Sequence, residues 1–177
     1  ITIGLASHTR PIAKAFLRQI KREFEGNETL KAWFPDILYA NPQKESPKWS
    51  EDDGIVVIRK SNPKEATIEA WGVVDGQPTS KHYKLLVYDD IVTRESVTSP
   101  EMMAKTTDAL ALSYNLGAHG GRRRFIGTRY HYNDTYRTLV DRGTVTPRIY
   151  PATDNGKIDG TPVFHTPEAL AEKRRDM

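Results

Sequence analysis

The 177-residue chain contains no cysteine, which excludes disulfide scaffolds, thiolate zinc sites and cysteine nucleophiles. No apolar run approaches the roughly 20 residues that a membrane-spanning helix needs. The pattern G-x-x-x-x-G-K-[ST], which forms the phosphate-binding Walker A loop, is also missing. The lack of cysteine removes disulfide-stabilised proteins and thiol enzymes from consideration, and the sequence offers no candidate for a membrane-spanning helix.

What is present is typical of a folded, water-soluble domain. Apolar residues make up 37% of the chain and charged residues 28%, a balance that argues against disorder. The formal net charge of +3 permits contact with nucleic acid without demanding it. The chain opens on an apolar segment without an initiator methionine or a basic leader, so we expect a piece of a longer polypeptide.

Hydrophobic patterning predicts a strand and then a helix at the start of the chain. Residues 1–6 form a short apolar run that ends at Ser7. Pro11 suits a first helical turn, apolar residues then recur at helical spacing, and Gly26 is a natural stop. A strand followed by a helix favours an α/β layered fold.

The later elements follow from turn and capping signals. Residues 38–53 are predicted to be a loop, and a helix is expected to start at Ser99 and Pro100 and to end at Gly117 and the glycines after it. The remaining expectations are strands over 54–60, 67–74, 83–88, 124–128 and 144–150, turns at 61–64 and 154–156, a helix capped by Asn133 that ends near Gly143, and a basic helix from Thr166.

The main chemical signal is the hydrophobic run Leu85-Leu86-Val87-Tyr88 followed by Asp89 and Asp90. A buried strand that ends in two acids places carboxylates at the carboxyl edge of a parallel sheet, where α/β folds bind ligands. In nucleotide-driven motors this is the Walker B arrangement, in which the first acid holds Mg²⁺ and the second orients the attacking water. Taken alone, the pair fits an ordinary loop start better, because acidic pairs after strands are common there.

A second strand-end signal follows one helix later, at Gly127-Thr128-Arg129. A small polar residue at the end of the neighbouring strand is where such motors sense the γ-phosphate, because its hydroxyl can hydrogen-bond phosphate or water. We therefore expect Asp89 and Thr128 on adjacent parallel strands, at the same edge of the sheet. A plain strand-to-loop turn is the alternative interpretation.

These segments together resemble the large terminase family of tailed bacteriophages. The resemblance rests on residues 85–90, on Val97-Thr98-Ser99 and on Phe125-Ile126-Gly127-Thr128-Arg129-Tyr130-His131-Tyr132-Asn133-Asp134, with support from Trp49-Ser50 and Ser7-His8-Thr9. It implies a three-layer α/β fold of P-loop NTPase (RecA/ASCE-like) type, with a mostly parallel sheet and added antiparallel strands. It also implies ATP and Mg²⁺ as cofactors.

The resemblance assigns roles to individual residues. Asp89 would hold Mg²⁺ through water, and Asp90 would be the catalytic acid at a position where many members carry Glu. Gly127, Thr128 and Arg129 would form the phosphate-sensing coupling motif. Ser7, Thr9 and Arg10 are candidate nucleic-acid contacts.

The resemblance also implies a setting for the protein. The family pumps double-stranded DNA into a procapsid from the host cell cytoplasm, acting transiently at the portal. Its partners are the portal protein, the small terminase subunit and further copies in a ring, with no membrane. Residues 1–177 would be a partial ATPase domain that lacks the upstream Walker A segment and the downstream nuclease domain, so we expect the isolated chain to be inactive. Lys81 stands near where many members carry an arginine that acts in trans.

Two other functions remain open from the residues. Asp89, Asp90 and Asp134 could form the two-metal cluster of a nuclease if their carboxylates converge, although Asp134 also suits a helix N-terminus. A non-enzymatic DNA-binding or assembly fragment is the other possibility. Arg122, Arg123 and Arg124 could contact DNA phosphates or form a solvated surface, and the five histidines share no metal-ligand spacing.

Overall fold

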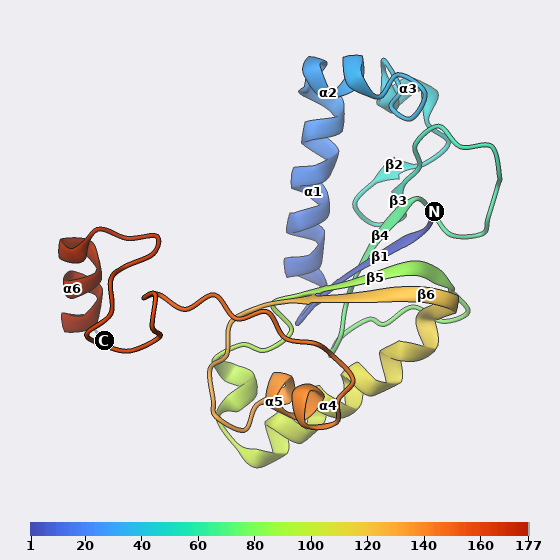
Figure 1. Ribbon diagram of the computed structural model, residues 1–177. Coiled ribbons are helices and arrows are strands. Elements are labelled where there is room, and N and C mark those ends of the chain that lie inside the picture. Colours follow the sequence, from blue (N-terminus) through green and yellow to red (C-terminus); the bar gives the residue numbers. More distant parts are fainter. Residues whose placement is uncertain (177) are drawn as a thin grey trace. The chain divides into compact units, whose positions relative to one another are not determined.

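A computed structural model describes residues 1–176 (Figure 1). Its centre is a six-stranded mixed sheet with the strand order β2-β3-β4-β1-β5-β6. Strands β4, β1, β5 and β6 are mutually parallel, whereas β2 and β3 pair in antiparallel fashion at one side. The strands are β1 (Ile3–Ser7), β2 (Trp49–Ser50), β3 (Gly54–Ile55), β4 (Ile68–Gly72), β5 (Tyr83–Asp89) and β6 (Gly117–Ile126).

Six α-helices accompany the sheet in the described chain. They are α1 (Arg10–Gly26), α2 (Glu28–Trp33), α3 (Pro42–Glu45), α4 (Pro100–Ser113), α5 (Thr135–Asp141) and α6 (Pro167–Arg175), and single 3₁₀ turns lie at Glu95–Val97 and Tyr114–Leu116. The chain divides into two compact units, Ile1–Leu139 and Val140–Met177. The first unit holds the whole sheet and all the residues of the predicted site.

Helix α1 covers one face of the sheet. Its start follows the sequence, with Thr9 at the N-cap and Pro11 in the first turn, where a missing N–H costs no hydrogen bond. Its apolar stripe packs on inward-facing residues of the strands, and the resulting core cluster comprises Leu5, Ala13, Leu17, Ile55, Ile68 and Ala70. Burial of this stripe, rather than helix propensity, is the main source of stability for such a helix.

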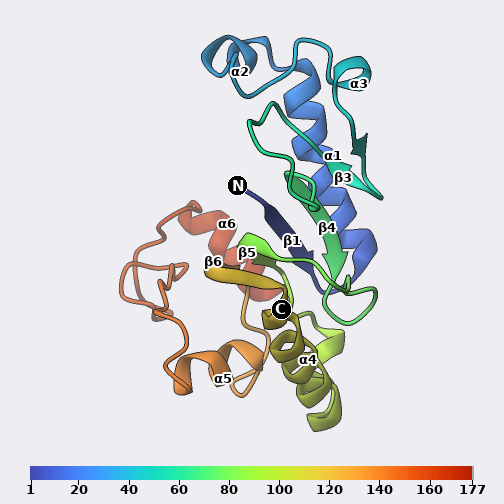
Figure 2. The same cartoon turned by 90° about the vertical axis from the view of Figure 1, so that its right-hand side faces the viewer.

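Helix α4 lies beside β5 and β6 in both ribbon views (Figures 1 and 2). The fully buried Tyr88 of β5 makes the link, because its hydroxyl lies 2.8 Å from Ser113 Oγ at the end of α4. The Tyr88 ring stacks on Phe125 of β6 at 4.9 Å and meets Trp71 of β4 edge to face at 6.1 Å. Leu17 of α1 belongs to the core cluster on the other face of the sheet. The sheet therefore lies between α1 and α4, as in an α/β layered fold.

Strand β6 forms one lateral edge of the sheet. It pairs with β5 in parallel, from Leu85 opposite Arg122 to Asp89 opposite Ile126, and it has no second neighbour among the described residues. Most of its side chains, including Arg122, Arg123 and Arg124, are exposed. This edge therefore presents unpaired backbone N–H and C=O groups to which another strand can pair.

The amino ends of the strands are held by a buried ionic cluster. Glu69 of β4 is 8% exposed, and its carboxylate accepts hydrogen bonds from Tyr83 Oη at 2.6 Å and Lys81 Nζ at 3.0 Å. Burial of the phenol raises the pKa of Tyr83, and the hydrogen bond and charge of Glu69 raise it further. This cluster lies at the opposite end of β5 from Asp89.

The second unit is built around a short hairpin-like loop and α6. Thr153 and Pro162 form an antiparallel bridge, and the Gly156 amide donates to Thr153 O, which confirms the turn predicted at 154–156. Thr166 caps α6 by accepting a hydrogen bond from the Ala169 amide, and three basic residues lie in the last turn. The predicted basic helix is therefore confirmed.

Several expected elements were wrong. Residues 38–53 contain α3 and β2 rather than a loop alone. The strand expected over 54–60 ends at Ile55, because the Val57 amide bonds to the Thr67 side chain instead of a strand backbone. Residues 144–150 form no strand, and their side chains are largely exposed, so no packing favours an extended pairing. The glycines from Gly117 onward begin β6 rather than end α4.

Candidate functional site at the carboxyl edge of the sheet

Three parallel strands end side by side at the carboxyl edge. Ala6 of β1 lies opposite Tyr88 of β5, and Asp89 lies opposite Ile126 of β6. The chain therefore leaves β5 at Asp89 and Asp90, and it leaves β6 at Gly127 and Thr128, on neighbouring strands joined through α4. This confirms the prediction that the acid pair and Thr128 share one edge of the sheet.

The two acids sit in a tight backbone turn. Asp90 has φ of 47°, a left-handed conformation that is uncommon for residues with a side chain but tolerated by aspartate. Its amide donates to Ile126 O at 3.0 Å, so the turn is pinned to the end of β6. Burial raises the pKa of Asp89, and the negative charge of Asp90 raises it further. The pair thus holds two repelling carboxylates, which is the electrostatic situation that a cation relieves.

The strand β1 side of this turn is held by His8. His8 is buried, and its Nδ1 lies 2.9 Å from Ile91 O, directly after the acid pair. The pairing of β1 with β4 extends past the ends of both strands, because the amides of Val73 and Val74 donate to Ser7 O and His8 O. The acid turn is therefore anchored to both of its neighbouring strands, which favours a fixed geometry for ligand binding.

Tyr136 of α5 reaches into the same place and was not anticipated from the sequence. Its hydroxyl donates to Ile126 O at 3.1 Å, the carbonyl that also accepts from the Asp90 amide. Burial raises the pKa of the Tyr136 phenol, the charges of Asp90 and Asp89 add to the rise, and the nearby backbone of Ile91 and Val92 opposes it. A tyrosine in the first turn of the helix after a strand-end glycine is the only trace of this contact in the sequence.

Gly127 is explained by that tyrosine. A Cβ built on Gly127 would lie 2.1 Å from Tyr136 Oη and 2.7 Å from its Cζ. No side chain fits there while the ring stays in place, so glycine is required by close approach rather than by a special backbone angle. Thr128, the next residue, is exposed at the same edge.

Arg129 and Asp134 organise the loop between β6 and α5. Arg129 Nη2 donates to His131 O and Tyr132 O, at 3.1 and 2.6 Å, and its Nε lies 3.5 Å from the Asp134 carboxylate. Asp134 is fully buried and accepts a hydrogen bond from the Arg137 amide at 3.0 Å. The helix cap is therefore Asp134, and the expectation that Asn133 caps α5 was wrong.

This arrangement weighs against the nuclease alternative. The Asp134 carboxylate already pairs with Arg129 and accepts from the Arg137 amide at the start of α5. Within residues 1–176, no group of three His, Cys, Asp or Glu side chains is placed to share a metal ion. The candidate metal ligands at this edge are thus the Asp89 and Asp90 carboxylates. Carboxylates supplemented by water are the ligand set that Mg²⁺ favours.

The residues considered for nucleic-acid contact differ in their availability. Ser7 is 0% exposed, and its hydroxyl finds no hydrogen-bond partner in the described chain, so burial removes it from a surface contact. Thr9 is half-buried at the α1 N-cap. Arg10 is exposed, with its amide bound to Asp75 at 2.7 Å and its guanidinium 3.2 Å from Asp52.

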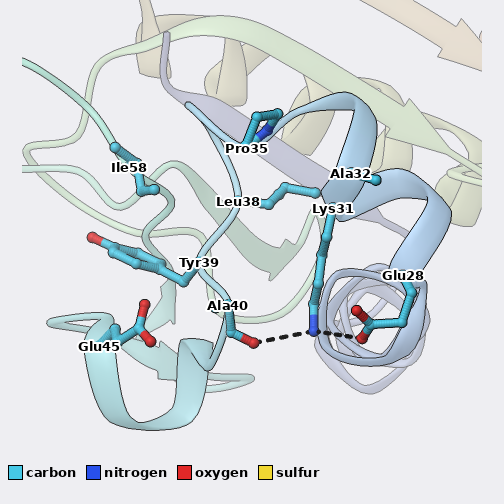
Figure 3. A pocket seen from close by; sticks show the side chains of 9 residues that line it. All are labelled: Glu28, Lys31, Ala32, Pro35, Leu38, Tyr39, Ala40, Glu45 and Ile58. Atoms are coloured by element: carbon cyan, nitrogen blue, oxygen red, sulfur yellow. Dashed lines mark hydrogen bonds and ion pairs between the residues drawn. The ribbon is translucent and has the colours of Figure 1, made fainter.

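Two other features lie away from this edge. Lys81 pairs with Glu69 at the amino end of β5, so it is not available as a trans-acting cation. A shallow pocket lies near the far end of α1, where Lys31 bonds to Glu28 and to Ala40 O (Figure 3). Since α1 runs back from the carboxyl edge, this pocket is at the other end of the helix from the acid pair.

Comparisons with known proteins add no identification. No protein-family model matches the chain, and a search of curated proteins finds no match. No helix in the described part of the chain has the length and apolar character needed to cross a bilayer.

Proposed function

We propose that this chain is the Walker B and coupling portion of a P-loop-type ATPase domain, as in the large terminase motors that move double-stranded DNA into a procapsid. The supporting observation is that β5 and β6 are parallel neighbours that end together, β5 at Asp89 just before Asp90, and β6 at Ile126 two residues before Thr128. In this proposal ATP and Mg²⁺ are the cofactors. The partners are DNA, the portal protein, the small terminase subunit and further copies in a ring in the host cytoplasm.

The roles follow from position and charge. Burial and the charge of Asp90 raise the pKa of Asp89. Asp89 would hold Mg²⁺ through water, and the bound cation would stabilise the charge of the transferring phosphoryl group. Asp90, the more exposed acid, would orient the attacking water and take up its proton. Thr128 would offer its hydroxyl to the γ-phosphate from the adjacent strand end.

The open edge of β6 gives the proposal a place for the missing phosphate-binding segment. A further parallel strand that paired with β6 would end beside Thr128, at the same carboxyl edge as the acids. A Walker A loop after such a strand would cradle phosphates next to the coupling motif, with its helix N-terminus supplying amide donors. We therefore expect the isolated 177-residue chain to have no ATPase activity of its own.

The decisive experiment is carried out in the full-length protein. Asp90→Asn should abolish ATP turnover while ATP binding survives, because an amide keeps the shape but cannot take a proton. The loss of a general base worth roughly 10²–10⁴ in rate corresponds to a barrier increase of roughly 3–5 kcal/mol. Near-normal turnover by Asp90→Asn would refute the proposed catalytic role.

Thr128→Val tests the coupling role in the same preparation. Valine is nearly isosteric with threonine, so the substitution deletes little more than the hydroxyl at an exposed strand end. We expect part of the ATP hydrolysis to persist while DNA packaging stops. If packaging and hydrolysis fall together, in proportion to lost stability, Thr128 is only a turn residue.

A further inference from the structure

Tyr136 lies where the two halves of the candidate site meet. Its hydroxyl donates to Ile126 O at the end of β6, at 3.1 Å, and the charges of Asp90 and Asp89 act on its phenol. Ile126 O also accepts from the Asp90 amide at 3.0 Å. One carbonyl and one phenol therefore join the acid turn, the end of β6 and the first turn of α5.

The position of Tyr136 along the chain makes this contact informative. It lies two residues after the buried Asp134, which is tied to Arg129 in the loop that follows Thr128. A displacement of that loop moves the start of α5, and with it the Tyr136 hydroxyl. The acid turn has the left-handed Asp90 at its centre, so it depends on such external contacts to keep its shape.

We propose that Tyr136 is a positioning residue for Asp89 and Asp90, whose hydroxyl clamps the acid turn to the end of β6 and links the turn to the Thr128–α5 segment. The inference rests on the proposed function, since it gives that clamp a role in ATP turnover. Tyr136 does not react. It holds the backbone from which the two carboxylates project, so that a shift at Thr128 reaches the acids through α5.

The clamp is tested by hydrogen exchange on the full-length protein carrying Tyr136→Phe. The ring stays and only the hydroxyl is lost, so the Ile126 carbonyl, which also accepts from the Asp90 amide, loses one of its two donors. With this restraint gone, exchange of the Asp90 amide should accelerate about tenfold, the effect of one lost hydrogen bond of typical strength. The Leu86 and Val87 amides, inside β5, should exchange as in the wild type.

Tyr88→Phe is the matched control. Tyr88 is a fully buried tyrosine in the same strand as Asp89, and its hydroxyl bonds to Ser113 of α4 rather than to the acid turn. It should lower global stability without selectively accelerating exchange of the Asp90 amide. If Tyr136→Phe leaves that amide unchanged, or speeds exchange equally through the sheet as a general loss of stability would, the clamp is refuted.

Steady-state kinetics supply the second readout. Misplacement of catalytic groups by a fraction of an ångström to an ångström costs up to about 100-fold in rate, so Tyr136→Phe should lower kcat about tenfold or more. The KM for ATP should change less than about twofold, because phosphate binding does not involve the clamp. Wild-type kcat in Tyr136→Phe, with Asp90→Asn inactive, would overturn the positioning role and leave the proposed function standing. Normal turnover by Asp90→Asn would instead refute the proposed function, and exchange would still decide whether Tyr136 holds the turn.

Discussion

Replacement of Gly127 by alanine tests the packing between β6 and α5 independently of any function. The new methyl carbon would lie 2.1 Å from Tyr136 Oη, 2.7 Å from Cζ and 3.0 Å from Cε2. All three distances are far below van der Waals contact, so the tyrosine ring has to move. Because the ring sits on a helix and its hydroxyl is bonded to Ile126 O, the movement also breaks that hydrogen bond.

The magnitude follows from these two effects. Overpacking of a well-packed contact costs typically about 1–3 kcal/mol, and the displaced hydrogen bond adds about 1 kcal/mol. We therefore expect Gly127→Ala to lower the free energy of unfolding by about 2–4 kcal/mol. For a chain of this length the unfolding midpoint should fall by roughly 4–16 °C.

The assay is urea and thermal unfolding of the chain followed by circular dichroism. Gly26→Ala is the control, because a Cβ at Gly26 has no heavy atom within 4 Å, and its effect should stay within about 0.5 kcal/mol or stabilise slightly. Combining Gly127→Ala with Tyr136→Leu, which removes the clashing atoms, should cost less than the sum of the single changes, by about 1–2 kcal/mol. A Gly127→Ala chain as stable as the wild type would refute the contact.

Two further predictions concern charge. Asp89→Asn should stabilise the chain at neutral pH by less than about 1 kcal/mol, since the folded state raises the Asp89 pKa and so disfavours its charge beside Asp90. A group whose pKa is raised in the folded state adds stability at low pH, and this contribution is lost as the pH rises through the folded-state pKa. The stability gained by Asp89→Asn should therefore vanish below about pH 4. An equal gain at every pH would contradict this cause. Lys81→Met leaves the buried Glu69 carboxylate without its ion pair and should cost about 3 kcal/mol in urea unfolding, whereas an effect below about 0.5 kcal/mol would show that the pair is effectively solvated.

The elements with long periodic patterns could be predicted from the sequence. The run before Asp89 and the helix after Pro11 bury one consistent set of apolar residues, so local pattern and tertiary packing agree. The shared edge of Asp89 and Thr128 followed from the same logic, because parallel strands joined by a helix end on the same side. The antiparallel strands were harder, since β2 and β3 are two residues each and carry almost no periodicity.

The contacts that complete the site depend on side chains meeting across the fold. In the sequence, nothing distinguishes Tyr136 from the other tyrosines of its segment. Its contact exists because α5 brings the Tyr136 hydroxyl to the Ile126 carbonyl at the end of β6. Asp134 could be predicted as a helix-terminal charge, but its full burial and its link to Arg129 could not. Glycine signals were ambiguous in the same way, because Gly117 suits a helix stop as well as a strand start.

The open edge of β6 has a consequence for how the chain behaves at high concentration. Unpaired backbone N–H and C=O groups along a ten-residue strand form a template on which a second copy can add its own edge. Arg122, Arg123 and Arg124 add three positive charges to this strand, with successive side chains on opposite faces of the sheet and Arg123 over the Tyr114 ring. Two copies that approach edge to edge therefore repel each other, which opposes their association. This repulsion weakens with added salt, because screening shortens its range to a few ångströms near 1 M.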